Sequence, residues 1–368
     1  MDTPTLDSAA ASELREVLAY YDLGELVDFE KNERGFVNTA YAIRVRTAGQ
    51  EKLYFMRKYK HGIGEEELLF EHSLIEHLVS AGSPVARIHH TLSGSTYLHT
   101  LDTSDPVCGT FYTIFEYLPG EDRFSWVDPI LSAEQIADSA RVLAQFHLDA
   151  INFRPRGARV EPKILELLPV IAETWSGCPA RSKRTVFDAR ILEMLDIARA
   201  NIETTIRRLN EPGARALPEM VIHCDYHPGN LKFSGDRVTG VFDFDWSKFD
   251  LRLFDVGLAL WYFCAAWSGA EDGALRLDAA RMFLNEYQWL MAHRPGGAPI
   301  TAEEALYLPT MINAGNLYVM HWTVMDFFAK DVDPVEYLIF LDHSLHFIEW
   351  YERAENRKAL QDTIDACL

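Results

Sequence analysis

Cysteine is scarce in this 368-residue chain: there are five, an odd number, and no two of them form a CxxC pair. This usage predicts neither a disulfide framework nor a zinc site, and it favours a reducing compartment. Positive charge is also in deficit, because 35 lysines and arginines are outnumbered by 55 aspartates and glutamates, for a formal net charge of −20. We therefore expect neither a nucleic-acid-binding protein nor one held on anionic lipid by a basic surface.

Long hydrophobic runs are missing as well. The longest, VGLALWYFCAAW at 256–267, is too short to cross a bilayer and predicts a buried helix. The first residues, MDTPTLDSAAASELREV, contain no basic segment followed by an apolar run, so we expect no signal peptide and a cytoplasmic protein. The overall composition, with 48% hydrophobic and 24% charged residues, is that of an ordinary soluble globular protein.

The first third of the chain has the pattern of an antiparallel sheet. Short apolar runs alternate with turn-rich segments. Strands are expected at 26–31, 39–47, 52–59, 83–92, 95–101 and 110–118. Helical spacing appears at 12–22 and, more strongly, at 65–82, where Gly82 supplies a stop signal.

Composition changes near residue 119, and helical patterns then prevail to the end of the chain. Ser132 and Gln135 form an S-x-x-Q capping box at the start of one such helix. The chain is also longer than a single core usually supports, so two lobes are expected. We predict an α+β fold with a small antiparallel β-sheet lobe and one main helix at 1–118, followed by a larger, mostly helical lobe at 119–368.

The most informative segment is HCDYHPGN at 223–230, which follows a short apolar strand. The runs LKF and VTGVFDF, joined by the turn SGDR, predict a hairpin that returns the chain to its starting point. Asn230, before the first strand, and Asp243, near the end of the second, should therefore lie side by side. Two oxygen donors at one edge suit Mg²⁺. Asp225, in the same loop, would then accept a proton from an attacking hydroxyl.

Two other interpretations of this segment remain open. His223, Asp225 and His227 are candidate ligands of a metal-dependent hydrolase, although no HExxH motif accompanies them. A catalytically silent nucleotide-binding module is the other alternative, but each position that chemistry would require holds a competent residue. A protein kinase is disfavoured, because no glycine follows Asp243-Phe244 and no activation segment separates this run from the next helix.

These motifs resemble the aminoglycoside phosphotransferase/choline kinase family, which includes homoserine kinases of type II and has a bilobal protein-kinase-like fold. The family pattern H-x-D-x-x-x-x-N matches His223, Asp225 and Asn230, and its following I-D-[FW]-[DE] element matches the run at 242–245. The resemblance implies Asp225 as catalytic base and Asn230 with Asp243 as Mg²⁺ ligands.

Three further residues have candidate roles. The resemblance makes His227 a candidate contact to the transferring phosphoryl group. Asp245 is either a second metal ligand or substrate contact, or the cap of a helix or loop. Asp255, in RLFDVGLAL, occupies the family position that begins a helix and braces the catalytic loop. His223 is expected to hold the loop by hydrogen bonds rather than to carry protons.

Phosphoryl transfer also needs a cation on the nucleotide phosphates and a rigid partner for that cation. YFMRKY supplies Arg57 and Lys58, which must point to opposite faces of a strand because they are adjacent. The family places its basic residue after a run of three apolar residues, which favours Arg57, with Lys58 as the alternative. Glu71, in the helix at 65–82, matches the family's helical glutamate and would pair with Arg57.

The remaining nucleotide contacts are implied by looser matches. GFVNTAY resembles the family's phosphate-covering loop, which makes Gly35 and Asn38 candidate contacts. FEYLPG lies where the family's hinge should be, so backbone groups from Glu116 to Leu118 would read the adenine. The sequence does not separate ATP from GTP.

The sequence thus predicts an ATP- and Mg²⁺-dependent kinase acting on a small-molecule hydroxyl, with no nucleic-acid or membrane partner. Homoserine, choline or ethanolamine, a sugar and an aminoglycoside are the candidate acceptor classes. A set of aromatic residues forms either a box for a quaternary amine or ordinary core. These are Trp246, Trp261, Tyr262, Trp322 and Phe327. Acceptor identity and oligomeric state stay open.

Overall fold

The chain divides into two compact units. The computed structural model describes residues 8–32, 38–101, 109–122, 124 and 131–368. Unit 1 comprises Met1–Pro119 together with Arg154–Arg159, and unit 2 comprises Gly120–Phe153 and Val160–Leu368. The division falls one residue after the boundary expected from the sequence, and the short segment at 154–159 belongs with the first unit.

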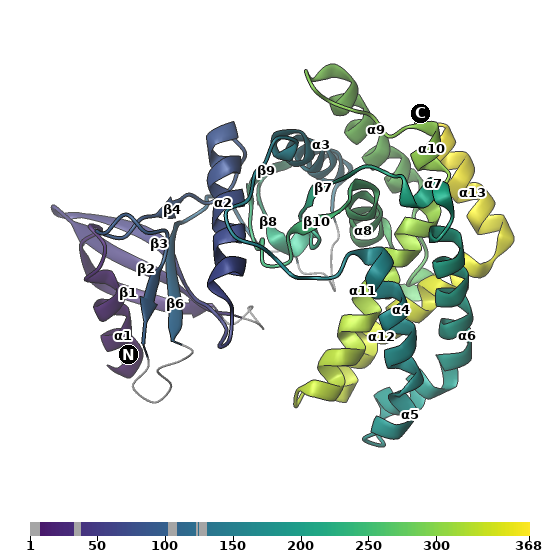
Figure 1. Ribbon diagram of the computed structural model, residues 1–368, viewed down its shortest axis with the longest axis horizontal. Helices are drawn as coiled ribbons and strands as arrows, with labels where there is room; N and C mark the ends of the chain where they lie inside the picture. Colours follow the sequence, from purple (N-terminus) through teal and green to yellow (C-terminus); the bar gives the residue numbers. More distant parts are fainter. Residues whose placement is uncertain (1–7, 33–37, 102–108, 123, 125–130) are drawn as a thin grey trace. The chain divides into compact units, whose positions relative to one another are not determined.

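Unit 1 is built on an antiparallel sheet (Figure 1). Its elements are α1 (Ser8–Leu18), β1 (Glu25–Asn32), β2 (Thr39–Thr47), β3 (Gln50–Lys58), α2 (Glu65–Ala81), β4 (Ile88–His89), β5 (Leu98–Thr100) and β6 (Thr110–Glu116). The strands lie in the order β1-β2-β3-β6-β4, and β5 pairs with β6. The expected strand at 83–92 shortens to the two residues of β4, which pair with Phe115 and Ile114 of β6.

The sheet of unit 1 is covered on both faces. Leu14, Val17 and Leu18 of α1 pack on one face, in a cluster that also contains Ile43 and Met56. α1 begins and ends four residues earlier than the helix expected at 12–22. On the opposite face, Leu68 of α2 packs with Tyr59 and Phe111. The side of β3 on which a residue lies therefore decides which helix it meets.

Unit 2 is mainly helical (Figure 1). Its helices are α3 (Ala133–Ala150), α4 (Ile164–Ser176), α5 (Cys178–Arg181), α6 (Val186–Leu209), α7 (Pro212–Arg215), η1 (Pro228–Asn230), α8 (Arg252–Cys264), η2 (Gly269–Glu271), α9 (Leu277–His293), α10 (Ala302–Ala305), α11 (Leu308–Ala329), α12 (Pro334–Glu352) and α13 (Ala354–Asp365). Its strands are β7 (Glu219–Ile222), β8 (Leu231–Ser234), β9 (Arg237–Val241) and β10 (Lys248–Leu251). The capping box expected at Ser132 and Gln135 is present at the start of α3.

The strands of unit 2 form two small antiparallel sheets. β8 and β9 make the hairpin expected from the sequence, whereas β7 pairs with β10. β10 was not expected, since in its sequence KFDL the apolar residues alternate with charged ones, and charged side chains are seldom buried in a sheet. The structure shows why this is tolerated: Lys248 and Asp250 are both buried and form an ion pair of 3.2 Å. This second sheet holds the two ends of the segment 223–247 together.

α8 and α11 cross at close range because each contributes a glycine to the crossing. A Cβ atom on Gly257 would lie 2.7 Å from the backbone carbon of Met311, and one on Gly315 would lie 2.9 Å from Cα of Leu258. All thirteen residues of α8 are buried. Even so, none of the helices in the described part of the chain has the length and apolarity needed to traverse a membrane.

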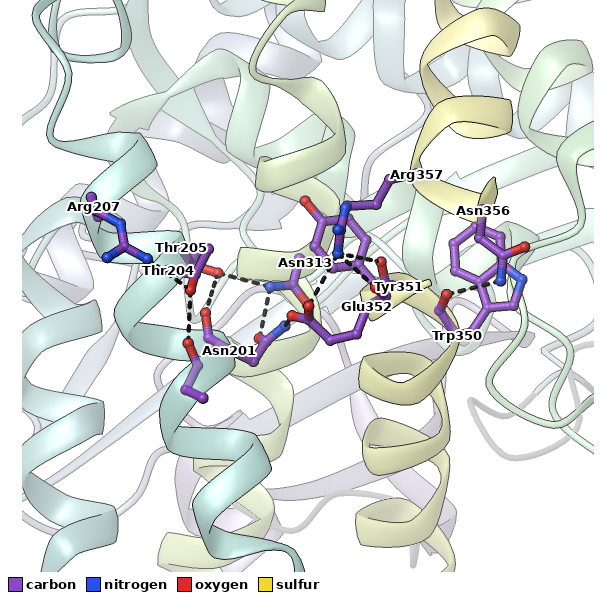
Figure 2. Close-up of polar contacts among 11 residues, drawn as sticks. Asn201, Thr204, Thr205, Arg207, Asn313, Trp350, Tyr351, Glu352, Asn356 and Arg357 are labelled. Carbon is purple, nitrogen blue, oxygen red and sulfur yellow. Dashed lines mark hydrogen bonds and ion pairs between the residues drawn. The ribbon is translucent and has the colours of Figure 1, made fainter. Parts of the chain in front are cut away.

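A polar network connects α11, α6 and α12 (Figure 2). Asn313 of α11 donates from Nδ2 to Asn201 Oδ1 at 2.9 Å and to Thr205 Oγ1 at 2.8 Å, both on α6. Asn201 in turn donates to Glu352 of α12 at 2.7 Å, and Arg357 donates to the other oxygen of Glu352. Asn313, Asn201 and Thr205 are buried, and an unsatisfied buried polar group is costly, so the bonds among them favour one register of α11 against α6. The bond from Asn201 to Glu352 then links α6 to α12 at the exposed end of the network.

Candidate active site

The segment 223–230 is a loop that follows β7, and a buried carboxylate holds its first residues in place. Asp255, in the first turn of α8, is fully buried and accepts from the backbone N–H of His223 at 3.0 Å and of Cys224 at 2.8 Å. His147, at the end of α3, also contacts Asp255, with Nε2 3.0 Å from Oδ2. The Nδ1 atom of His147 is hydrogen-bonded to the hydroxyl of Tyr287. One carboxylate therefore ties the loop to α3, α8 and α9.

Asp225 lies at the centre of the loop with both carboxylate oxygens engaged. Asn230 donates from Nδ2 to Asp225 Oδ2 and to the Asp225 carbonyl, both at 2.9 Å. Tyr262 of α8 donates to Oδ1 at 3.2 Å. The side chain of Asp225 is 21% exposed, so the carboxylate is oriented by its neighbours yet open to solvent on one side.

His227 borders the same carboxylate. Its Nδ1 accepts from the N–H of Gly229 at 3.0 Å, so in the neutral ring the proton is on Nε2, which lies 3.6 Å from Asp225 Oδ2. The ring lies 5.0 Å from that of Tyr262. His227 is thus a neighbour of Asp225 at slightly more than hydrogen-bond distance.

The hairpin brings Asn230 and Asp243 to one edge. Leu231 pairs with Val241, and the N–H of Phe242 donates to the carbonyl of Asn230 at 3.1 Å. Asp243 follows directly in a left-handed conformation, with φ of 66°. Such strain in a residue other than glycine is often found at functional sites.

This edge has the donor atoms that magnesium prefers. A carboxylate and an amide oxygen are hard donors, and Mg²⁺ is typically held by one or two such groups together with water and phosphate. Both described hydrogen bonds of the Asn230 side chain come from its amino nitrogen, which leaves Oδ1 to a metal. Asp243 and Asn230 therefore fit this ion. Asp245 lies two residues further, in a turn closed by the hydrogen bond from Ser247 N to Phe244 O.

His223 has the structural role expected of it. It is fully buried, and its Nε2 lies 3.2 Å from the carbonyl of Phe242, which joins the loop to the end of the hairpin. Burial lowers the pKa of His223 below its usual value, so the ring is neutral. In the described residues no group of three or more His, Cys, Asp or Glu side chains is arranged to hold a metal ion. This finding counts against the hydrolase interpretation, which requires His223, Asp225 and His227 as a cluster.

Cys224 is expected to be chemically inert despite its place beside Asp225. The residue is fully buried, and burial raises the pKa of its thiol to about 12, whereas only the thiolate reacts readily. Iodoacetamide at neutral pH should leave Cys224 unlabelled in the folded protein, and the same reagent should label it fully after unfolding in guanidinium. Mass spectrometry of the tryptic peptide measures both states. Labelling of the folded protein at the rate of a free thiol would contradict this assignment.

In unit 1 the structure brings Arg57 and Glu71 together. Arg57 Nη1 lies 3.1 Å from Glu71 Oε1, and the two side chains are 10% and 1% exposed. The guanidinium also lies over the rings of Tyr59 and Phe115, at 5.7 and 5.6 Å from their centroids. Lys58 points to the other face of the sheet and pairs with Glu13 of α1 at 2.6 Å. Arg57 is thus the residue of the two that is held rigidly by α2.

The other residues expected near the nucleotide are placed as follows. Asn38 precedes β2, and its Oδ1 accepts from the N–H of Lys60 at 2.9 Å. Glu116 ends β6, where its N–H donates to the carbonyl of Arg87, and Leu118 lies two residues further along. Gly35 lies outside the described residues.

The aromatic residues proposed as a box make several separate ring contacts. The rings of Trp246 and Trp322 lie 5.0 Å apart, and Tyr262 instead packs against His227. Phe327 stacks on Phe187 at 4.0 Å, within the helical core. Core packing is therefore the better interpretation of Phe327.

Sequence reasoning missed the contact between Tyr262 and Asp225. A signal for it was present, because Tyr262 follows Asp255 by seven residues, or two turns of α8, so both side chains lie on one helix face. Since Asp255 braces the loop, a residue on the same face was a candidate to reach it. The partnership of His147 with Asp255 had no comparable local signal, because 108 residues separate them.

Comparison with known proteins extends over most of the chain. A model of the phosphotransferase enzyme family matches residues 28–298. The homoserine kinase of Rhodopseudomonas palustris strain BisA53 is 25% identical over 339 residues, which cover 89% of this chain and 90% of that protein. Among solved structures, a microcompartment-associated aminopropanol kinase aligns with a TM-score of 0.63 at 14% identity, over 95% of this chain and 98% of the other. An amicoumacin kinase bound to AMP-PNP and Ca²⁺ aligns with a TM-score of 0.64 at 14% identity, over 94% and 93% of the two chains. These structural likenesses confirm the predicted fold class.

Proposed function

Because the chain belongs to the phosphotransferase enzyme family, we propose that it is an ATP- and magnesium-dependent kinase that phosphorylates a hydroxyl group of a small molecule. The proposal rests on the orientation of the Asp225 carboxylate, to which Asn230 and Tyr262 both donate hydrogen bonds. The hairpin places Asp243 next to Asn230 at the same edge. A positioned base beside two oxygen donors for a metal is what phosphoryl transfer to an alcohol requires.

In the proposed reaction the acceptor hydroxyl is oriented by the carboxylate of Asp225. The hydroxyl oxygen forms a bond to the γ-phosphorus as the bond from that phosphorus to the β,γ-bridging oxygen breaks. The hydroxyl proton passes to Asp225, and ADP leaves with the bridging oxygen. The net reaction converts ATP and an alcohol into ADP, a phosphate monoester and one proton, without a covalent enzyme intermediate.

Asn230 Oδ1 and the carboxylate of Asp243 would hold the magnesium ion. Bound there, Mg²⁺ would neutralise negative charge on the β- and γ-phosphates. Asp245, two residues beyond Asp243, is proposed as a second metal ligand or a contact to the acceptor. His227 is proposed to donate from Nε2 to the transferring phosphoryl group, since that atom borders Asp225.

Nucleotide binding would use groups of unit 1. Backbone groups from Glu116 to Leu118 would read the adenine, and Asn38 with Gly35 would belong to the loop that covers the phosphates. Arg57, fixed by Glu71, would contact the α- and β-phosphates. ATP is the proposed donor in the cytoplasm, with GTP to be tested beside it.

Replacement of Arg57 separates it from Lys58 as the phosphate contact. Arg57→Ala should lower kcat/KM for ATP by roughly 10- to 100-fold, since a charge-assisted hydrogen bond contributes about 1.5–3 kcal/mol. Lys58→Ala is the matched control, because Lys58 pairs with Glu13 on the opposite face, and we expect it to stay within about 2-fold. Steady-state kinetics over a range of ATP concentrations measure both. The reverse pattern would assign the contact to Lys58.

A small amino alcohol is the first candidate acceptor, and L-homoserine the first compound. The support is the homoserine kinase relative, which aligns along nearly its full length. Choline, ethanolamine, aminopropanol, simple sugars and aminoglycosides complete the panel.

A coupled assay of ADP release over this panel tests the proposed function. We expect release to depend on one acceptor class, to stop in excess EDTA and to return with excess Mg²⁺. Phosphorus NMR of the product distinguishes a phosphate monoester from phosphate released by ATP hydrolysis. A rate of ADP release that no acceptor increases, or that stays unchanged in excess EDTA, would overturn the proposal.

A further inference from the structure

A tyrosine from a different element holds the carboxylate at the centre of the site. Tyr262 lies on α8, is 3% exposed, and donates from its hydroxyl to Asp225 Oδ1 at 3.2 Å. We propose that Tyr262 is a positioning residue that fixes the plane of the Asp225 carboxylate for proton acceptance. The inference rests on the proposed function and adds to it a residue outside the loop and hairpin motifs.

Two donors are needed because a single one leaves the carboxylate free to turn. The terminal torsion of an aspartate has a broad, roughly two-fold profile, so Asn230 alone, bonded to Oδ2, permits rotation of the other oxygen. Tyr262 adds a second fixed point at Oδ1, on a helix rather than on the loop. Bonds to both oxygens fix the plane of the carboxylate, and a fixed plane lets an acceptor hydroxyl be met in a reactive geometry.

Tyr262 is itself held in place. Its ring lies against that of His227 at 5.0 Å, and its carbonyl accepts from Trp267 Nε1 at 3.2 Å. The ring of Trp267 stacks on His343 of α12 at 3.6 Å and 10°. Asp272 accepts from His343 Nδ1 at 2.8 Å. A residue anchored through this many contacts is suited to orient another residue.

The chemistry of the phenol agrees with a fixed donor. Burial, with the nearby charge of Asp225, raises the pKa of Tyr262 above its usual value, so the hydroxyl keeps its proton at any working pH. It therefore does not compete with Asp225 for the proton of the acceptor. Its part is to orient the carboxylate.

The variant Tyr262→Phe tests this role by removing only the hydroxyl. We expect kcat to fall about 10- to 100-fold, because a small misplacement of a reacting group costs up to about 10²-fold. KM for ATP should stay within about 2-fold, and the melting temperature should fall no further than in the control variant, since each variant loses only one hydroxyl. Tyr318→Phe is the matched control: its hydroxyl is buried beside the same loop but lies 3.7 Å from the Cys224 sulfur.

The assay uses the full-length enzyme, saturating ATP and the best acceptor of the panel, with L-homoserine first. If the wild-type enzyme is active and the kcat of Tyr262→Phe lies within about 2-fold of the wild-type kcat, the role of Tyr262 is overturned and the proposed function stays intact. A fall in kcat that Tyr318→Phe reproduces, or that comes with a much larger drop in melting temperature than Tyr318→Phe shows, would also overturn it, because general loosening would explain both. A wild-type enzyme inactive on the whole panel would overturn the proposed function, and this role with it.

Discussion

Asp225→Ala is expected to lower kcat by about 10²- to 10⁴-fold, the usual contribution of a positioned general base. The variant removes the group that accepts the proton, and it leaves Asn230 and Tyr262 without the carboxylate they orient. Asp225→Asn should be nearly as inactive, since the amide keeps the shape but cannot take the proton. Initial rates of ADP release at saturating ATP and acceptor measure the effect.

Asp236→Ala is the matched control for Asp225→Ala. Asp236 is an exposed aspartate in the turn of the β8–β9 hairpin, where its Oδ1 accepts from Ser132 Oγ. The same substitution there should leave kcat within about 2-fold, because surface substitutions seldom act at a distance. An Asp225→Ala enzyme that keeps a tenth or more of wild-type kcat, a loss of no more than roughly 1.4 kcal/mol, would show that Asp225 is not the base.

The loop and hairpin could be predicted from the sequence because their geometry is local. Turn residues and two short apolar runs are enough to bring Asp243 back beside Asn230, and the pairing of Leu231 with Val241 confirms the hairpin. The spacing of Asp225 and Asn230 likewise puts both in one short loop. The segment 223–245 alone was enough to predict this part of the site.

The bracing of the site could not be predicted from local pattern. β10 was missed because its charged residues, Lys248 and Asp250, are buried as an ion pair, which the local sequence pattern does not indicate. His147 and Asp255 meet across 108 residues of chain, and no sequence period reports such a contact. Long-range hydrogen bonds of this kind follow from tertiary packing rather than from propensity.

The choice between Arg57 and Lys58 shows the same division. Alternation along a strand predicts that the two side chains face opposite ways. Which face carries α2 and which carries α1 is a property of the packed unit, and the structure places Glu71 on one side and Glu13 on the other. The alternation of the strand predicts that only one of the two residues faces α2, and the packing of the unit determines that it is Arg57.

Asp255→Ala is expected to cost roughly 3–5 kcal/mol of folding free energy and to abolish activity in the protein that still folds. Its carboxylate accepts from the N–H groups of His223 and Cys224, and His147 Nε2 contacts it as well. Each buried donor left without a partner costs about 1–3 kcal/mol. Burial alone would raise the pKa of Asp255, but the hydrogen bonds from His147 and from the backbone N–H of His223 outweigh it and lower that pKa, so the carboxylate is charged.

Asp188→Ala separates loss of stability from loss of the site. Asp188, at the start of α6, is also buried, and it accepts from the N–H groups of Lys183 and Thr185, so its removal should cost a similar free energy. It has no part in the loop at 223–230, and kcat measured well below the melting temperature should be unchanged. Urea unfolding gives the free energies of unfolding of both variants on one scale.

If Asp255→Ala kept wild-type kcat while showing the same destabilisation as Asp188→Ala, the hydrogen bonds to Asp255 would contribute to stability alone. The expected split, equal destabilisation but activity lost only at Asp255, follows because the two N–H groups that Asp255 holds are those immediately before Asp225.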